Sequence, residues 1–117
     1  MSETVNYKQA IERAGGNAAL AKELFSMLLK ELPELREQLR RAIAAQDLGA
    51  SWDYAHKIYG STAYCAVPML ASAAQATEAA IKAQDIGELT KQFDAMSAAI
   101  DNLLVSGDEH LQADWQT

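Results

Sequence analysis

The sequence is poor in residues that would cross-link the chain or break it into many turns. Its single cysteine, Cys65, cannot form a disulfide within the chain. Two prolines and six glycines occur among 117 residues, whereas 50% of the residues are hydrophobic. This balance excludes a disordered, collagen-like or low-complexity chain and predicts a single globular domain over residues 1–117.

Basic residues are also scarce. Lys and Arg total 10 against 16 Asp and Glu, which gives a formal net charge of −6. An acidic chain is a poor match for nucleic acid or an anionic membrane surface, so we expect a protein partner and no direct membrane contact. No apolar run approaches the roughly 18 residues of a membrane helix, and the N-terminus lacks the pattern of a signal peptide. These absences favour a cytoplasmic location.

Turn and capping signals divide the chain into five helical segments. Candidate first-turn or capping residues are Asn6, Asn17, Asp47, Pro68 and Asp85. Asn6 and Gln9 have the spacing of a capping box, which predicts a short first helix that ends at Gly15. We expect the third helix to run from Asp47 to about Cys65. A turn at 106–108 then predicts a loose polar tail over 106–117, in which Trp115 is the residue able to dock on the rest of the chain.

Apolar residues recur at three- and four-residue steps, as on one face of a helix. They are Leu20, Leu24, Leu28, Leu32, Leu35, Leu39 and Ile43 in the second segment, and Ile86, Leu89, Phe93, Met96, Ile100 and Leu103 in the fifth. Pro33 should kink the second helix without ending it. The fourth segment has a core face rich in alanine, which allows close helix packing: Leu70, Ala73, Ala74, Thr77, Ala80 and Ile81. We predict an all-α antiparallel four-helix bundle with its core at about 5–105, capped at one end by the first helix.

The third segment points one histidine away from the core. On a helical wheel, Ala55, Ile58 and Thr62 share the core side, whereas His56 points outward. Gly60 follows one turn later, although glycine costs about 1 kcal/mol relative to alanine in a helix interior. Close approach of another molecule at this point would explain the glycine.

A low-relief surface is expected around His56. Its candidate members are Trp52, Asp53, Lys57, Tyr59, Gly60 and Ala63. Gly60 and Ala63 form a strip of small residues, and Trp52 with Tyr59 forms an apolar border, as is typical of a docking surface. Lys57 lies farther round the helix and could meet an anion only at the periphery.

Other interpretations of these residues are weaker or stay open. A lone surface histidine is most often only solvated. Asp53 and His56 have a spacing that can chelate a metal, but a bundle metal site draws ligands from several helices, so we expect none. Cys65 lies on the other side of the helix and cannot form a nucleophile and base pair with His56. The Gly15–Gly16 pair is too short for a phosphate-binding loop, so we expect no ATP site.

The segment Ala55–Thr62, AHKIYGST, resembles the histidine, glycine and serine signature of histidine-containing phosphotransfer (HPt) domains. The stretches Tyr7–Gly16, Leu28–Leu35 and Tyr64–Leu70 are also similar to that family. The similarity is greatest to the C-terminal HPt domain of BarA/GacS-type hybrid sensor histidine kinases. It covers nearly all of residues 5–105.

The resemblance implies that His56 is a phosphoacceptor in two-component signalling. It would take a phosphoryl group from the phosphoaspartate of one receiver domain and pass it to the aspartate of a response regulator, while Gly60 lets the receiver come close. A neutral imidazole has a lone pair for attack on phosphorus. Mg²⁺ and the catalytic lysine would belong to the receiver, so this chain would need no cofactor of its own. We also expect it to be a monomer. It would be free-standing or the cytoplasmic end of an inner-membrane kinase.

Two positions depart from the family pattern. The residue three after the histidine is usually basic and here is Tyr59, which leaves open what stabilises the phosphoryl oxygens. The residue ten after it is often glycine and here is Ala66. A second hypothesis therefore stands beside the relay: a helical interaction module that binds receiver domains without being phosphorylated.

Overall fold

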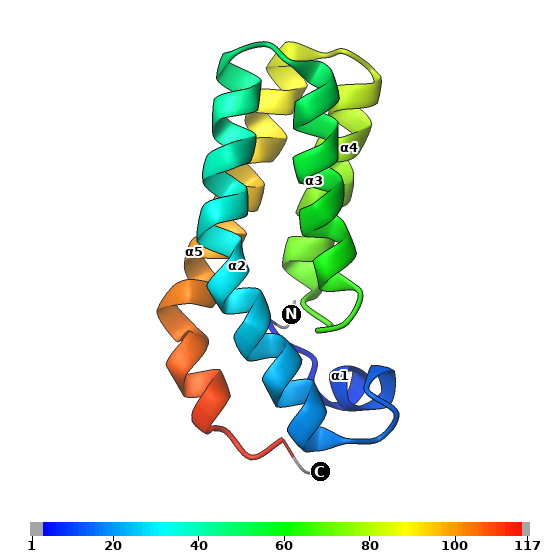
Figure 1. Ribbon diagram of the computed structural model, residues 1–117, viewed down its shortest axis with the longest axis vertical. Coiled ribbons are helices and arrows are strands. Elements are labelled where there is room, and N and C mark those ends of the chain that lie inside the picture. The colour runs from blue at the N-terminus through cyan, green and yellow to red at the C-terminus, as the bar shows by residue number, and fades with distance from the viewer. Residues whose placement is uncertain (1–3, 116–117) are drawn as a thin grey trace.

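Residues 4–115 are described by the computed structural model, and five helices account for most of them. These are α1 (Tyr7–Arg13), α2 (Ala18–Ala44), α3 (Leu48–Thr62), α4 (Pro68–Lys82) and α5 (Ile86–Gln112). Helices α2 to α5 run antiparallel along the long axis, and α1 lies across one end (Figure 1). Helix α2 contacts α3 and α5, and α4 contacts the same two, which closes the bundle. The predicted four-helix bundle with an N-terminal capping helix is confirmed.

The predicted helix starts are confirmed at every position. Side-chain oxygens accept the backbone N–H three residues later in four helices, as Asn6 from Gln9, Asn17 from Leu20, Asp47 from Ala50 and Asp85 from Glu88. Pro68 occupies the first turn of α4, where its missing N–H would have no helical partner in any case. Local side-chain chemistry therefore sets all five starts.

Helix α2 continues through Pro33, as expected. Its axis changes direction midway along its length (Figure 1), and Pro33 lies near the middle of the helix. A proline ring crowds the carbonyl four residues earlier, which bends a helix without necessarily ending it. Helix α3, in contrast, ends at Thr62, one turn before the predicted end near Cys65.

The core follows the predicted faces of α3 and α4 but departs at the ends of α2 and α5. Leu20 is 40% exposed and Ile86 is 53% exposed, although both begin the apolar faces of their helices. At the start of α2, the buried residues are Ala21 and Phe25 instead. The Phe25 ring packs against residues near the C-terminal end of the described chain, which its own helix pattern could not indicate.

The expectation of a turn at 106–108 and a loose tail over 106–117 was wrong for residues 106–115, and its last two residues lie outside the described part of the chain. Helix α5 runs on to Gln112, and Gly107 is buried within it. A Cβ at Gly107 would lie 2.8 Å from Leu29 Cδ1, so this glycine permits close packing of α5 on α2. Docking of Trp115 is confirmed, because its side chain is 3% exposed and its indole N–H donates to the His110 carbonyl at 2.7 Å.

An aromatic cluster joins both ends of the described chain to the bundle. The Tyr7 hydroxyl forms a hydrogen bond with Nδ1 of His110, and the Tyr7 and Trp115 rings are 4.7 Å apart at their centroids. Phe25 lies 5.7 Å from the rings of both His110 and Trp115. The cluster thus ties α1, α2 and the end of α5 together. No helix in residues 4–115 has the length and apolarity needed to cross a bilayer.

We predict that acidification loosens this aromatic cluster. Burial lowers the pKa of His110, and Glu109 opposes the effect only in part. The unfolded chain therefore binds this proton more readily than the folded chain. The stability linked to His110 is fully present above its unfolded pKa of about 6.5, and it is lost as pH falls below that value and through the lower pKa of the folded state.

Urea unfolding from about pH 7.5 to about pH 5.5 measures this loss. The variant His110→Gln cannot gain the proton and should show a flatter dependence on pH. His56→Gln serves as the control for the other histidine and should keep the His110 effect. Equal pH dependence in the wild type and His110→Gln would contradict the prediction.

Candidate functional site

His56 lies in the middle of α3 on the exposed face of the helix. Its side chain is 55% exposed, whereas Ala55 and Ile58 on the same helix are fully buried. The outward direction predicted from the helical wheel is therefore confirmed. The imidazole is accessible to a partner of protein size.

A carboxylate from the neighbouring helix α4 contacts the imidazole. Nδ1 of His56 lies 3.1 Å from Oε1 of Glu78, whose side chain is only 13% exposed. A carboxylate accepts hydrogen bonds, so it favours the tautomer with the proton on Nδ1. That tautomer leaves the lone pair on Nε2. In that tautomer, the imidazole offers Nε2 as the nucleophile while its second nitrogen is held in place by Glu78.

Trp52 contacts the imidazole from one turn earlier in α3. The two rings are stacked, with centroids 4.5 Å apart and planes inclined by 12°. On the neighbouring helix α4, Nζ of Lys82 lies 5.8 Å from the centroid of the Trp52 ring. Trp52 was expected only as the border of a docking surface, but it packs directly on the candidate nucleophile.

The other predicted surface residues make no polar or ring contact with the imidazole. Among residues 4–115, no hydrogen bond, ion pair or ring contact joins the imidazole to Asp53, Lys57, Tyr59, Gly60 or Ala63. Tyr59 is partly buried and packs against the core, so it is less available to a phosphoryl group than expected. Lys57 is exposed, with Nζ 5.5 Å from the Tyr54 ring centroid. The carbonyl of Ala63 accepts a hydrogen bond from Arg13 at 3.2 Å, which caps the end of α3.

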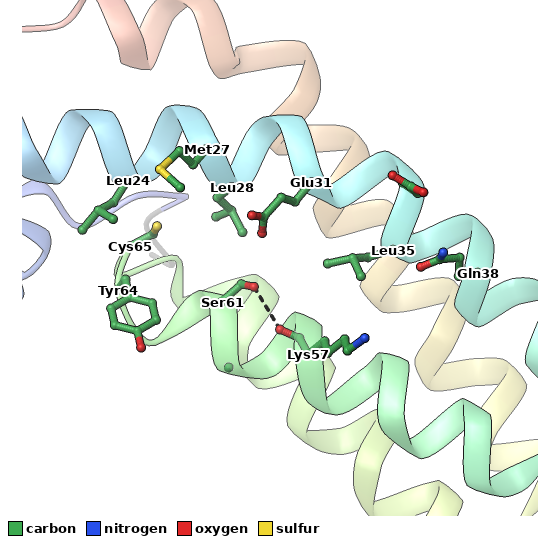
Figure 2. A pocket seen from close by; sticks show the side chains of 12 residues that line it. Leu24, Met27, Leu28, Glu31, Leu35, Gln38, Lys57, Ser61, Tyr64 and Cys65 are labelled. Carbon is green, nitrogen blue, oxygen red and sulfur yellow. Dashed lines mark hydrogen bonds between the residues drawn. The ribbon is translucent and has the colours of Figure 1, made fainter.

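Gly60 opens onto a groove between α2 and α3. Apart from its chain neighbours and the nearby backbone of its own helix, no atom of the described residues lies within 4 Å of a Cβ built at Gly60, so helix packing does not require a glycine there. The groove has a volume of about 650 Å³. Figure 2 shows side chains of α2 on one side and of α3 and its following turn on the other. Its lining includes Leu24, Met27, Glu31, Glu34, Leu35, Lys57 and Tyr64. Exposed apolar side chains at one end, such as Tyr64 at 60%, make it suited to a protein partner.

Cys65 also lines this groove but is 2% exposed. Burial, with a contribution from Glu31, raises the pKa of its thiol to about 11. The thiol is therefore protonated at neutral pH and is a poor nucleophile. In the described part of the chain, no group of three or more His, Cys, Asp or Glu side chains is placed to hold a metal ion.

Glu78 and Lys82 were not found from the sequence. Both face α3 from α4, where Glu78 is the only acidic residue and Lys82 the only basic one in a helix of 15 residues. Isolated charges in an alanine-rich packing helix are a signal that could have drawn attention to them. The backbone also shows why glycine suits the position of Ala66, because its φ is 50°, a conformation that glycine adopts without strain.

Comparisons with known proteins place this geometry in a family. The Hpt domain family matches residues 23–106. Among solved structures, the HPT domain of an Hpt sensor hybrid histidine kinase from Shewanella superposes with a TM-score of 0.73. It is 27% identical, and the match covers 94% of this chain and 97% of that one.

Curated relatives agree with the structural match. Sensor histidine kinase GacS of Pseudomonas protegens is 35% identical over 83 residues, which cover 71% of this chain and 9% of that protein. Sensor protein GacS of Pseudomonas syringae pv. syringae is 38% identical over 78 residues, 67% of this chain and 9% of that protein. The kinase BarA of Shigella flexneri is 32% identical over 75 residues, 64% of this chain and 8% of that protein. This chain is thus similar to a small part of much longer kinases, and it belongs to the Hpt domain family.

Proposed function

We propose that His56 carries a phosphoryl group between receiver domains. The observation that carries this proposal is the contact of Glu78 with Nδ1 of an imidazole that is 55% exposed. A histidine that is only solvated needs no largely buried carboxylate beside it from another helix. Membership of the Hpt family and similarity to parts of sensor kinases support the same role.

The transfer is an in-line displacement at phosphorus. The lone pair of Nε2 forms the nitrogen–phosphorus bond while the bond from phosphorus to the aspartyl oxygen breaks. The electron pair of that bond returns to the receiver carboxylate, and the Nδ1 proton stays between the ring and Glu78. Return transfer to a second receiver reverses these steps. Mg²⁺ would be held by the receiver and would offset the charge of the phosphoryl oxygens, as in other phosphoryl transfers.

The α2–α3 groove is the surface on which we place the receiver. It lies on the Gly60 side of α3, so a partner seated there covers Gly60 and reaches His56. The opposite flank of α3 is occupied by α4, which holds Glu78 and Lys82. Residues 1–117 would then act as one monomeric HPt domain in the cytoplasm, with receivers of a hybrid kinase and of a response regulator as its two partners.

A receiver domain charged with acetyl phosphate provides the direct test. Incubation with labelled phosphoreceiver should label this chain through a bond that is labile in acid and stable in alkali. His56→Gln should abolish the label while helical content and melting temperature stay nearly unchanged, because the side chain lies outside the core. His110→Gln should keep the label. A label that persists in His56→Gln would place the phosphosite elsewhere.

The same assay distinguishes the second hypothesis. A non-phosphorylated module would bind the receiver, by titration calorimetry for example, and yet take no label from it or from phosphoramidate, a small phosphoryl donor. Binding without labelling from either donor would overturn the relay and favour the interaction module.

We predict that Glu78→Ala slows labelling of His56 by roughly ten- to a hundredfold. A hydrogen bond to a charged group contributes about 1.5–3 kcal/mol, and about 1.4 kcal/mol corresponds to a tenfold change in rate. Glu78→Gln keeps an acceptor oxygen and should fall between the wild type and Glu78→Ala. Asp94→Asn removes an exposed carboxylate on α5 and is the control. Unchanged rates in both Glu78 variants would show that the contact plays no part in transfer.

We predict that replacing Gly60 by alanine stabilises the fold but slows phosphoryl transfer. Gly60→Ala should raise the free energy of unfolding by up to about 1 kcal/mol, because the site is open and alanine is the better helix former. Gly107→Ala is the matched control and should gain less, because the new methyl must displace Leu29. Urea unfolding measures both. A clear loss of stability in Gly60→Ala would contradict the assignment of Gly60 to an open surface.

Although Gly60→Ala should stabilise the fold, substitutions at Gly60 should slow phosphoryl transfer from the receiver. Gly60→Gln adds a long side chain one turn from His56 and should slow transfer sharply, whereas Gly60→Ala should slow it only mildly. Labelling by phosphoramidate should be unchanged in both variants, because this donor does not need the docking surface. Equal loss with both donors would indicate damage to His56 itself.

A further inference from the structure

We propose that Trp52 is a positioning residue for His56, an inference that rests on the function proposed above. The structure assigns the indole to one face of the imidazole, where it fixes the plane of the ring. Lys82 in turn holds the indole from α4. The receiver would therefore meet a nucleophile whose direction is set before docking.

Two contacts, one helical turn apart, connect the antiparallel helices α3 and α4. Trp52 lies four residues before His56 in α3, and Lys82 lies four residues after Glu78 in α4. Each pair is thus one turn apart on neighbouring helices. One contact places Nζ of Lys82 over the face of Trp52, and the other joins Glu78 to Nδ1 of His56. The stacking of Trp52 on His56 links these two contacts.

The two contacts of the imidazole constrain different motions. The hydrogen bond from Nδ1 to Glu78 fixes one atom, but the ring can still turn about the line of that bond. A stacked neighbour with planes inclined by 12° opposes such turning. Together they fix the direction of the Nε2 lone pair. In-line attack depends on alignment within about 10–20°, so this constraint acts on the rate of transfer.

The place of Trp52 itself depends on ring contacts. Its Nε1 is buried and has no hydrogen-bond partner among the described residues. The indole is therefore not oriented by its own N–H, unlike that of Trp115. What remains is the packing of the ring and the ammonium of Lys82 over it, a favourable cation–π arrangement. A phenyl ring could keep much of this packing, whereas a methyl group could not.

Tryptophan fluorescence tests the stack without any receiver. In the variant Trp115→Phe, Trp52 is the only tryptophan, and its emission no longer mixes with that of a residue next to His110. A protonated imidazole quenches an indole stacked on it, so emission should fall as pH is lowered. His56→Gln in the same background should remove this change. A titration that persists unchanged in His56→Gln would show that the two rings are not stacked in solution.

Transfer kinetics test the consequence for function. With a receiver domain charged with acetyl phosphate, Trp52→Ala should lower kcat about tenfold and leave KM within about twofold. Trp52→Phe should restore kcat to within about threefold of the wild type, and Lys82→Met should cause a smaller loss than Trp52→Ala. Labelling by phosphoramidate should change less than about twofold in all three, because a small donor can follow a rotated ring. Tyr54→Ala is the control, since Tyr54 is another partly buried aromatic of α3 that does not contact His56.

The outcomes separate this inference from the function it rests on. If kcat in Trp52→Ala equals that of the wild type while His56→Gln is inactive, the positioning role is wrong and the phosphotransfer role stands. If His56→Gln is still labelled, the phosphotransfer role is wrong. If Trp52→Ala fails to fold, Lys82→Met decides: a kcat in Lys82→Met no lower than in the wild type and in the Tyr54→Ala control overturns the proposal.

Discussion

Close packing of α3 on α4 is the constraint on which the site depends. The two helices bury mainly small side chains, among them Ser51, Ala55, Ala74 and Thr77. The distance between helix axes follows the side chains at the contact, so small residues bring the backbones together. Only then can a side chain as short as glutamate reach across from α4 to Nδ1 of His56. The alanines of α4 thus support the site through the distance between the helices.

Much of the fold could be predicted because its signals are local. Asn6, Asn17, Asp47 and Asp85 each cap the helix that they precede, and a cap depends only on the next three residues. The stop predicted around Gly107 failed for the opposite reason. A glycine that ends a helix and a glycine that admits a neighbouring helix look alike in the sequence. The decisive contact, with Leu29, lies far away along the chain.

The site divides in the same way. The exposure of His56 follows from the periodicity of one helix, and so it could be predicted from that helix alone. The contacts that define its chemistry do not, because Glu78 lies 22 residues away on another element. Trp52 is an intermediate case: its spacing of four residues from His56 allows contact, but the spacing cannot distinguish a stacked ring from a surface border. Sequence resemblance named the histidine, and the structure supplies the groups around it.

The two flanks of α3 separate binding from chemistry. On the α4 flank, Glu78 contacts the imidazole, and Trp52, which lies beneath Lys82, stacks on it. The α2 flank carries an open groove that is lined in part by Gly60 and not by His56. A change in the groove can therefore alter which receiver docks without altering the nucleophile. In the relay proposed for His56, such independence would let two receivers meet the same nitrogen while the groove alone distinguishes between them.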